Sequence, residues 1–114
     1  MLRNILDALE AATGLPVKPF GTDSPKDCIT YRWSCQRDDG CLAQYRLELR
    51  LITKTVKAAQ QNEKKIRRAL VDLGDTHRLT GASIEQNGGG TLRDDGTGTI
   101  HTLFYFDVKT RSDL

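Results

Sequence analysis

The sequence predicts an α+β fold, in which two helices pack on one face of a mainly antiparallel, twisted sheet of four or five strands. Three observations predict it. Two segments carry apolar residues at helical spacing, two further pairs of segments read as strands, and a short turn signal joins the first pair. In chain order the elements read α-β-β-α-β-β. Because an antiparallel sheet needs one covered face, we expect both helices on the same side.

Length and composition indicate a single domain that does not span a membrane. Its 114 residues suffice for one domain, 1–114, with a single core. The net charge of +2 is far from the basicity of a dedicated nucleic-acid binder. No apolar run approaches the roughly 18 residues that cross a bilayer, and Asp7 and Glu10 interrupt the apolar stretch near the start. We therefore expect no membrane partner, no signal peptide, and a protein of the cytosol or of something assembled there.

The first expected helix covers residues 2–12. Gly14 supplies a C-cap and Pro16 prevents the helix from resuming. Its apolar stripe, at spacings of three and four, consists of Leu2, Ile5, Leu6, Leu9 and Ala12.

Two strongly alternating segments, 29–35 and 43–51, predict a hairpin. One face of each carries aromatic and aliphatic residues, and the other carries Arg32, Arg46 and Arg50. We expect no aromatic residue among these arginines, so that a platform for stacking single-stranded bases is missing.

The connection between these two strands predicts their register. Asp38-Asp39-Gly40 suits a three-residue hairpin loop with Gly40 in the left-handed region, which would pair Arg37 with Cys41. Trp33 then lies opposite Tyr45. A slip of one residue would set the aromatic residues opposite charges, so the register is well specified.

A second, longer helix is expected from Thr55, a potential N-cap, to Leu73, with Gly74 ending it. Its outer face is basic and includes Lys64, Lys65 and Arg68.

The last third predicts a second hairpin. Residues 79–86 form a weak strand, and residues 100–108 form a strong one with bulky side chains on both faces, which places it inside the sheet. Between them, residues 87–98 hold five glycines and two aspartates. Glycine has a high conformational entropy and no side chain to bury, so we expect 87–98 to be a mobile loop.

Metal binding, cofactor binding and catalysis each lack a supporting motif. Cys28, Cys35 and Cys41 are seven and six residues apart, whereas zinc sites usually present pairs two to four residues apart. Neither His77 nor His101 lies in a context that would aim it at a nucleophile. We expect no enzyme activity, no metal and no cofactor.

The composition instead favours a role at subunit interfaces. The basic groups and the acidic turns offer surfaces of opposite charge, and a long glycine-rich segment can order against a neighbour. The candidate interface residues are Arg32, Arg46, Arg50, Lys64, Lys65, Arg68, Asp38, Asp39, Asp94 and Asp95.

The order of several segments resembles that of a known family. These segments are ILDAL (5–9), TGLPV (13–17), CITYRW (28–33), YRLELRLITKT (45–55), ALVDLG (69–74) and TLFYFDV (102–108). In this order they resemble the small tail-terminator or tail-completion proteins, including minor tail and head-tail joining proteins, of long-tailed phages and prophages. The strongest part of the resemblance is the step from TGLPV into the first hairpin.

The resemblance implies a fold, a function and partners. It implies helices on one side of a mainly antiparallel sheet and a virion structural subunit, which caps the tail tube and joins it to the head connector. It further implies a ring, typically a hexamer, whose partners are the tail-tube protein, the head-tail connector protein and DNA passing through the lumen. The localisation would be the virion, and the host cytoplasm during assembly. A nucleic-acid-associated or regulatory domain of a mobile element is the alternative.

Overall fold

The computed structural model describes residues 2–21, 26–75 and 82–112, and for 71–75 the backbone alone. The predicted α+β class and element order are confirmed, with one short strand in addition. The elements are α1 (Leu2–Thr13), β1 (Val17–Pro19), β2 (Cys28–Asp38), β3 (Leu42–Thr53), α2 (Val56–Asp75), β4 (Ser83–Asp94) and β5 (Thr99–Arg111).

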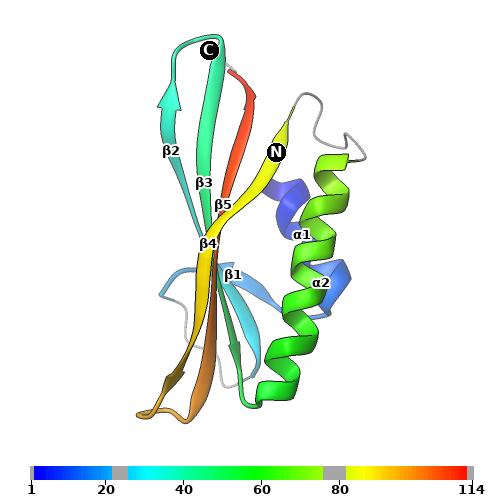
Figure 1. Cartoon of the computed structure of the whole chain (residues 1–114), viewed down its shortest axis with the longest axis vertical. Helices are drawn as coiled ribbons and strands as arrows, with labels where there is room; N and C mark the ends of the chain where they lie inside the picture. The colour runs from blue at the N-terminus through cyan, green and yellow to red at the C-terminus, as the bar shows by residue number, and fades with distance from the viewer. Residues whose placement is uncertain (1, 22–25, 76–81, 113–114) are drawn as a thin grey trace.

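The five strands form one twisted sheet in the order β1-β2-β3-β5-β4. The short β1 runs parallel to β2, and all other neighbours are antiparallel. Both helices lie on the same side of the sheet (Figure 1). The β2–β3 and β4–β5 hairpins extend to opposite ends of the molecule, which measures 45 × 24 × 21 Å.

The core lies between the helices and the sheet. Ile5 and Leu9 from α1 meet Ile66 and Leu70 from α2 above the central strands, with Phe104 of β5 fully buried among them. Alternation along each strand sends every second residue to this face. We call the opposite face, which the helices leave uncovered, the outer face.

The predicted helix caps are present, with one exception. The Gly14 N–H donates to the Glu10 carbonyl at 2.8 Å with a φ of 70°, and the Ala58 N–H donates to Thr55 Oγ1 at 3.1 Å. Gly74, in contrast, does not end α2, which continues to Asp75. Glycine costs about 1 kcal/mol within a helix, which weakens it but does not by itself end it.

The predicted register of the first hairpin was wrong by two residues. Trp33 lies opposite Leu47, and Tyr45 lies opposite Cys35. The turn is longer than predicted, and a β-bulge between Cys35 and Arg37 adds a residue to β2. Because the shift is even, each side chain keeps its predicted face. Trp33 and Tyr45 still stack as diagonal neighbours, with ring centroids 4.7 Å apart and planes at 14°.

The second hairpin differs most from the prediction, because most of the glycine-rich segment 87–98 belongs to a strand. β4 runs to Asp94 and pairs with β5 along most of its length. Gly88 and Gly89, at φ of 106° and 150°, lie at the bulge between Gln86 and Gly89. The predicted strand residues 79–81 lie outside the described residues. The mobility of 87–98 remains a prediction.

Within the described ranges, no helix combines the length and the apolar character needed to cross a membrane.

Candidate assembly surfaces

Two arginines of the outer face are stacked on aromatic rings. The Arg46 guanidinium lies 4.7 Å from the ring centroid of Tyr105, and that of Arg50 lies 5.5 Å from the centroid of Phe20. The prediction that no aromatic residue accompanies these arginines was therefore wrong. The alternation of β5 already indicated that Tyr105 faces away from the core, whereas nothing in the sequence indicated that Phe20, beyond β1, reaches Arg50.

The outer face carries charges of both signs. Arg32 is exposed and lies opposite Glu48, whose carboxylate is 3.7 Å from Arg46 Nε. Arg50 is half-buried, and its Nε makes no hydrogen bond within the part of the chain that the structure describes. Arg46 is thus held by Tyr105 and Glu48, and Arg50 has the Phe20 ring as its contact, while Arg32 is exposed to a neighbour.

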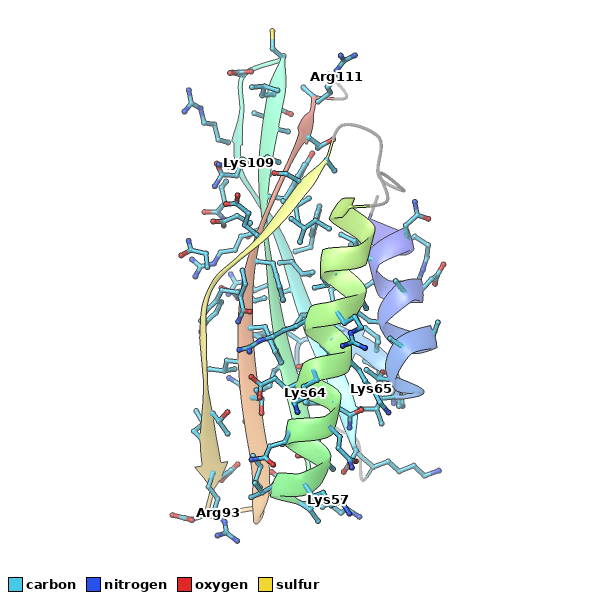
Figure 2. All side chains as sticks on the ribbon, turned by 45° about the vertical axis from the view of Figure 1, so that its right-hand side comes forward. Lys57, Lys64, Lys65, Arg93, Lys109 and Arg111 are labelled. Carbon is cyan, nitrogen blue, oxygen red and sulfur yellow. The ribbon has the colours of Figure 1, made fainter. Side chains whose placement is uncertain are left out.

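A second predicted group lies on α2, on the other side of the molecule. Lys64, Lys65 and Arg68 are exposed and, with Gln61, line a shallow open depression of about 440 Å³. Figure 2 shows Lys64 and Lys65 projecting from this helix. The helix thus presents a basic surface that the core separates from the outer face.

The acidic turn of the first hairpin uses its carboxylates internally. Asp38 Oδ1 accepts hydrogen bonds from Gly40 N at 3.0 Å and from the Ser112 hydroxyl at 2.7 Å. Asp39 Oδ1 accepts from the N–H groups of Leu42, at 2.8 Å, and Cys41, at 2.9 Å. These two N–H groups, that of Leu42 first, lower the pKa of Asp39.

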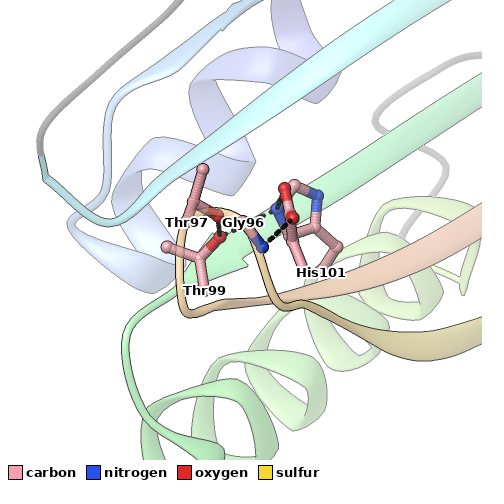
Figure 3. Close-up of polar contacts among 5 residues, drawn as sticks. Gly96, Thr97, Thr99 and His101 are labelled. Carbon is pink, nitrogen blue, oxygen red and sulfur yellow. Dashed lines mark hydrogen bonds and ion pairs between the residues drawn. The ribbon is translucent and has the colours of Figure 1, made fainter.

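The turn between β4 and β5 is built in the same way (Figure 3). Asp94 Oδ1 accepts from Gly96 N at 3.0 Å, and this bond, followed by one from the Thr97 hydroxyl, lowers the pKa of Asp94. His101 Nε2 lies 2.9 Å from the Thr99 hydroxyl and 4.0 Å from Asp94 Oδ2. Asp95, also a predicted interface residue, is exposed.

The ten predicted interface residues therefore occupy four places instead of one surface. The three arginines lie on the outer face, the three cationic residues of α2 lie on the helical side, and the two acidic pairs lie at opposite ends of the long axis. Their roles at an interface remain a prediction.

The two turn carboxylates predict how the stability of the protein depends on pH. The folded-state pKa values of Asp39 and Asp94 are lowered, so both carboxylates stabilise the folded protein at a pH above their unfolded-state pKa of about 4. This stabilisation is lost as the pH falls through their folded-state pKa values. Carboxyl titration by NMR should show both below the usual range, with unfolding by urea becoming easier over the same pH window. In Asp39→Asn and Asp94→Asn the corresponding part of this acid sensitivity should disappear. An unchanged pH dependence in the double variant would contradict the assignment.

Among the described residues, no three His, Cys, Asp or Glu side chains are grouped so that they could hold a metal ion. Cys28 is buried, while Cys35 and Cys41 are exposed. His77 lies outside the described residues. That the protein is not an enzyme remains a prediction.

A solved virion structure contains a chain with a similar fold. That structure is described as "Virion of native gene transfer agent (GTA) particle". The two chains have a TM-score of 0.71 over 97% of this chain and 92% of the other, with 14% sequence identity. No protein-family model matches the sequence, and no curated protein matches it. At this identity the likeness shows that the fold is shared.

Proposed function

We propose that this protein is a structural subunit of a phage-like virion, and more narrowly a tail-terminator or tail-completion subunit. The observation that carries the proposal is the match of fold, over nearly the full length of both chains, with a chain of the gene transfer agent virion. The sequence resemblance to tail-completion proteins supports the narrower role. The protein would act through its surfaces, without catalysis, in the virion and beforehand in the host cytoplasm.

The proposed mechanism is geometric. A ring of subunits caps the finished tail tube, with one side matching the tube protein and the other facing the head connector. A ring interface is heterologous, so each subunit needs two different complementary patches. The basic depression on α2 and the acidic turns at the ends of the molecule supply charges of opposite sign on separate parts of the surface.

Charge reversal on α2 tests the assembly surface. Replacing Lys64, Lys65 and Arg68 with glutamate should weaken ring formation or docking to the tail tube by about tenfold or more, because the long-range attraction becomes repulsion. Sedimentation of the protein and electron microscopy of tails completed with it measure the effect.

A matched control reverses as many charges elsewhere. Lys54, Lys57 and Arg111 are exposed and lie outside the depression, so replacing these three with glutamate changes the net charge equally and should leave assembly intact. If the α2 triple variant assembles as the unmodified protein does, the basic depression is not an assembly surface.

One observation favours the alternative, nucleic-acid binding. The stacked pairs of Arg46 with Tyr105 and Arg50 with Phe20 combine positive charge with aromatic rings on one face, as single-strand binding surfaces do. Binding through phosphates would give an affinity that falls steeply with the logarithm of salt concentration. A gel-shift titration at several salt concentrations therefore separates the two functions.

A further inference from the structure

The sheet has an open edge on β2. On one side β2 pairs with β3 along its length, but on the other β1 covers only Ile29–Tyr31. On this second side, residues 32–38 consequently have no strand beside them within the described chain. We call this stretch the β2 edge.

The backbone groups of the β2 edge point outward. The Ile29 N–H donates to the Pro16 carbonyl and the Tyr31 carbonyl accepts from the Phe20 N–H, both at 2.9 Å, so these odd-numbered residues direct their backbone groups away from β3. In an antiparallel ladder the direction alternates with each residue. Trp33 and Cys35 therefore present N–H and C=O groups to the β2 edge.

A second open edge lies on β4, at the other end of the strand order. β4 pairs with β5 alone among the described strands. Residues 88–94, here called the β4 edge, begin with Gly88, Gly89 and Gly90, which place no side chain beside an approaching strand, and they also expose Leu92 by 48%. Natural proteins usually protect edges with proline, lysine or a covering segment. Neither edge contains proline or lysine. Charged residues are present on both, Arg32, Arg37 and Asp38 on the β2 edge and Arg93 and Asp94 on the β4 edge, and a β-bulge follows Cys35.

We propose that the β2 edge of one copy pairs with the β4 edge of the next, so that a single sheet continues from subunit to subunit. Each copy carries one edge of each kind, which makes the contact heterologous and lets it repeat around a ring. The polarity of the strands allows it. β2 and β4 run in opposite directions, so two copies set side by side with their strands oriented alike form an antiparallel pair.

Charge and face define a register for this pair. With Arg32 opposite Asp94, both on the outer face, an exposed guanidinium meets a carboxylate of the neighbouring copy. The same register sets Cys35 opposite Thr91. Both of these side chains are exposed and both lie on the face toward the helices. Because Cys35 is level with Ile84 in its own sheet, through Tyr45 and Val108, this register shifts each copy along the strands, and a closed ring needs an axis inclined to them. The closure into a ring rests on the proposed function; the pairing of edges does not.

The test uses Cys35 as a probe of the register. Residues opposite each other in an antiparallel pair have Cα atoms about 4.5–5.5 Å apart, within the range that a disulfide spans. Mild oxidation of Thr91→Cys, in a Cys41→Ser background that removes the other exposed thiol, should thus give a ladder of disulfide-linked oligomers on a non-reducing gel. Mass spectrometry should identify the bond between Cys35 and the thiol introduced at position 91.

The matched control lacks the probe thiol. Thr91→Cys with both Cys35→Ser and Cys41→Ser should give no ladder. Absence of the ladder in the first variant, or its persistence in the control, would overturn the proposal.

A second variant tests the backbone directly. Cys35→Pro removes an N–H that points to the open edge and spares the hydrogen bonds to β3. Circular dichroism checks that the variant is folded. Its association constant, measured by sedimentation, should be about tenfold lower than that of the unmodified protein, which equals 1.4 kcal/mol. Unchanged association would contradict the edge contact.

These outcomes separate the inference from the proposed function. Disulfide ladders from a protein that never enters tails would retain the edge pairing and remove the virion role. Incorporation into tails without the 35–91 bond would retain the virion role and remove the edge pairing.

Discussion

Replacing Phe104 with alanine is expected to lower the free energy of unfolding by about 3–5 kcal/mol. Phe104 is fully buried at the centre of the sheet, where it lies between Leu49 of β3 and Gly89 of β4. Its ring also stacks on that of Phe106, with centroids 6.1 Å apart. Glycine on one side cannot move in to fill the space, so the substitution leaves a cavity in addition to removing buried apolar surface.

Equilibrium unfolding in urea measures this effect. A domain of this kind has about 5–15 kcal/mol of stability in total, so Phe104→Ala should shift the midpoint strongly or leave the protein partly unfolded. Leu92→Ala is the control, since Leu92 is 48% exposed and its truncation should change stability by about 0.5 kcal/mol or less. Equal midpoint shifts in the two variants would show that Phe104 is not central to the core.

Helices and strand faces were predictable because each depends on a periodic pattern that extends over many residues. The stripe containing Ile5 and Leu9 had to be buried, and the caps at Gly14 and Thr55 follow from local chemistry. The faces of β2 and β3 survived an error in register, because a shift of two residues leaves the alternation unchanged.

Register and strand ends were not predictable, since they depend on contacts between distant segments. The first turn is set by the Asp39 carboxylate, which accepts two backbone N–H bonds, and the bulge after Cys35 has no signal in composition. Phe20 lies thirty residues from Arg50 in the chain, so their contact requires the fold. The candidate interface residues were chosen by charge, and the fold alone showed that they lie on different surfaces.

The glycine-rich segment shows why composition misled the prediction for β4. Glycine is costly in a strand on average, yet individual glycines serve where a side chain would not fit. Gly88 and Gly89 lie at the β4 bulge with positive φ. The part of β4 that follows the bulge, up to Asp94, pairs with β5. The composition indicated a loop, whereas the ladder with β5 makes a strand.

Gly89→Ala should therefore destabilise the protein by about 2–4 kcal/mol. A β-carbon at this position would run into the carbonyl oxygen of Leu103 on β5, and the φ of 150° at Gly89 is one that other residues rarely adopt. Backbone atoms cannot move aside as a flexible side chain would. The strand pair must then separate locally, next to the buried Phe104.

The neighbouring Gly90 supplies a matched control with the opposite expected sign. A β-carbon there would meet nothing within 4 Å, and the backbone has no positive φ. Gly90→Ala should leave stability unchanged or raise it by about 0.4–1 kcal/mol, because alanine restricts the unfolded chain. Urea unfolding of both variants, with hydrogen exchange of the β4 and β5 amides, distinguishes a strand from a loop. If residues 87–98 were a loop in solution, the two substitutions would have similar, small effects, and the β4 edge proposed to receive a neighbouring copy would not exist.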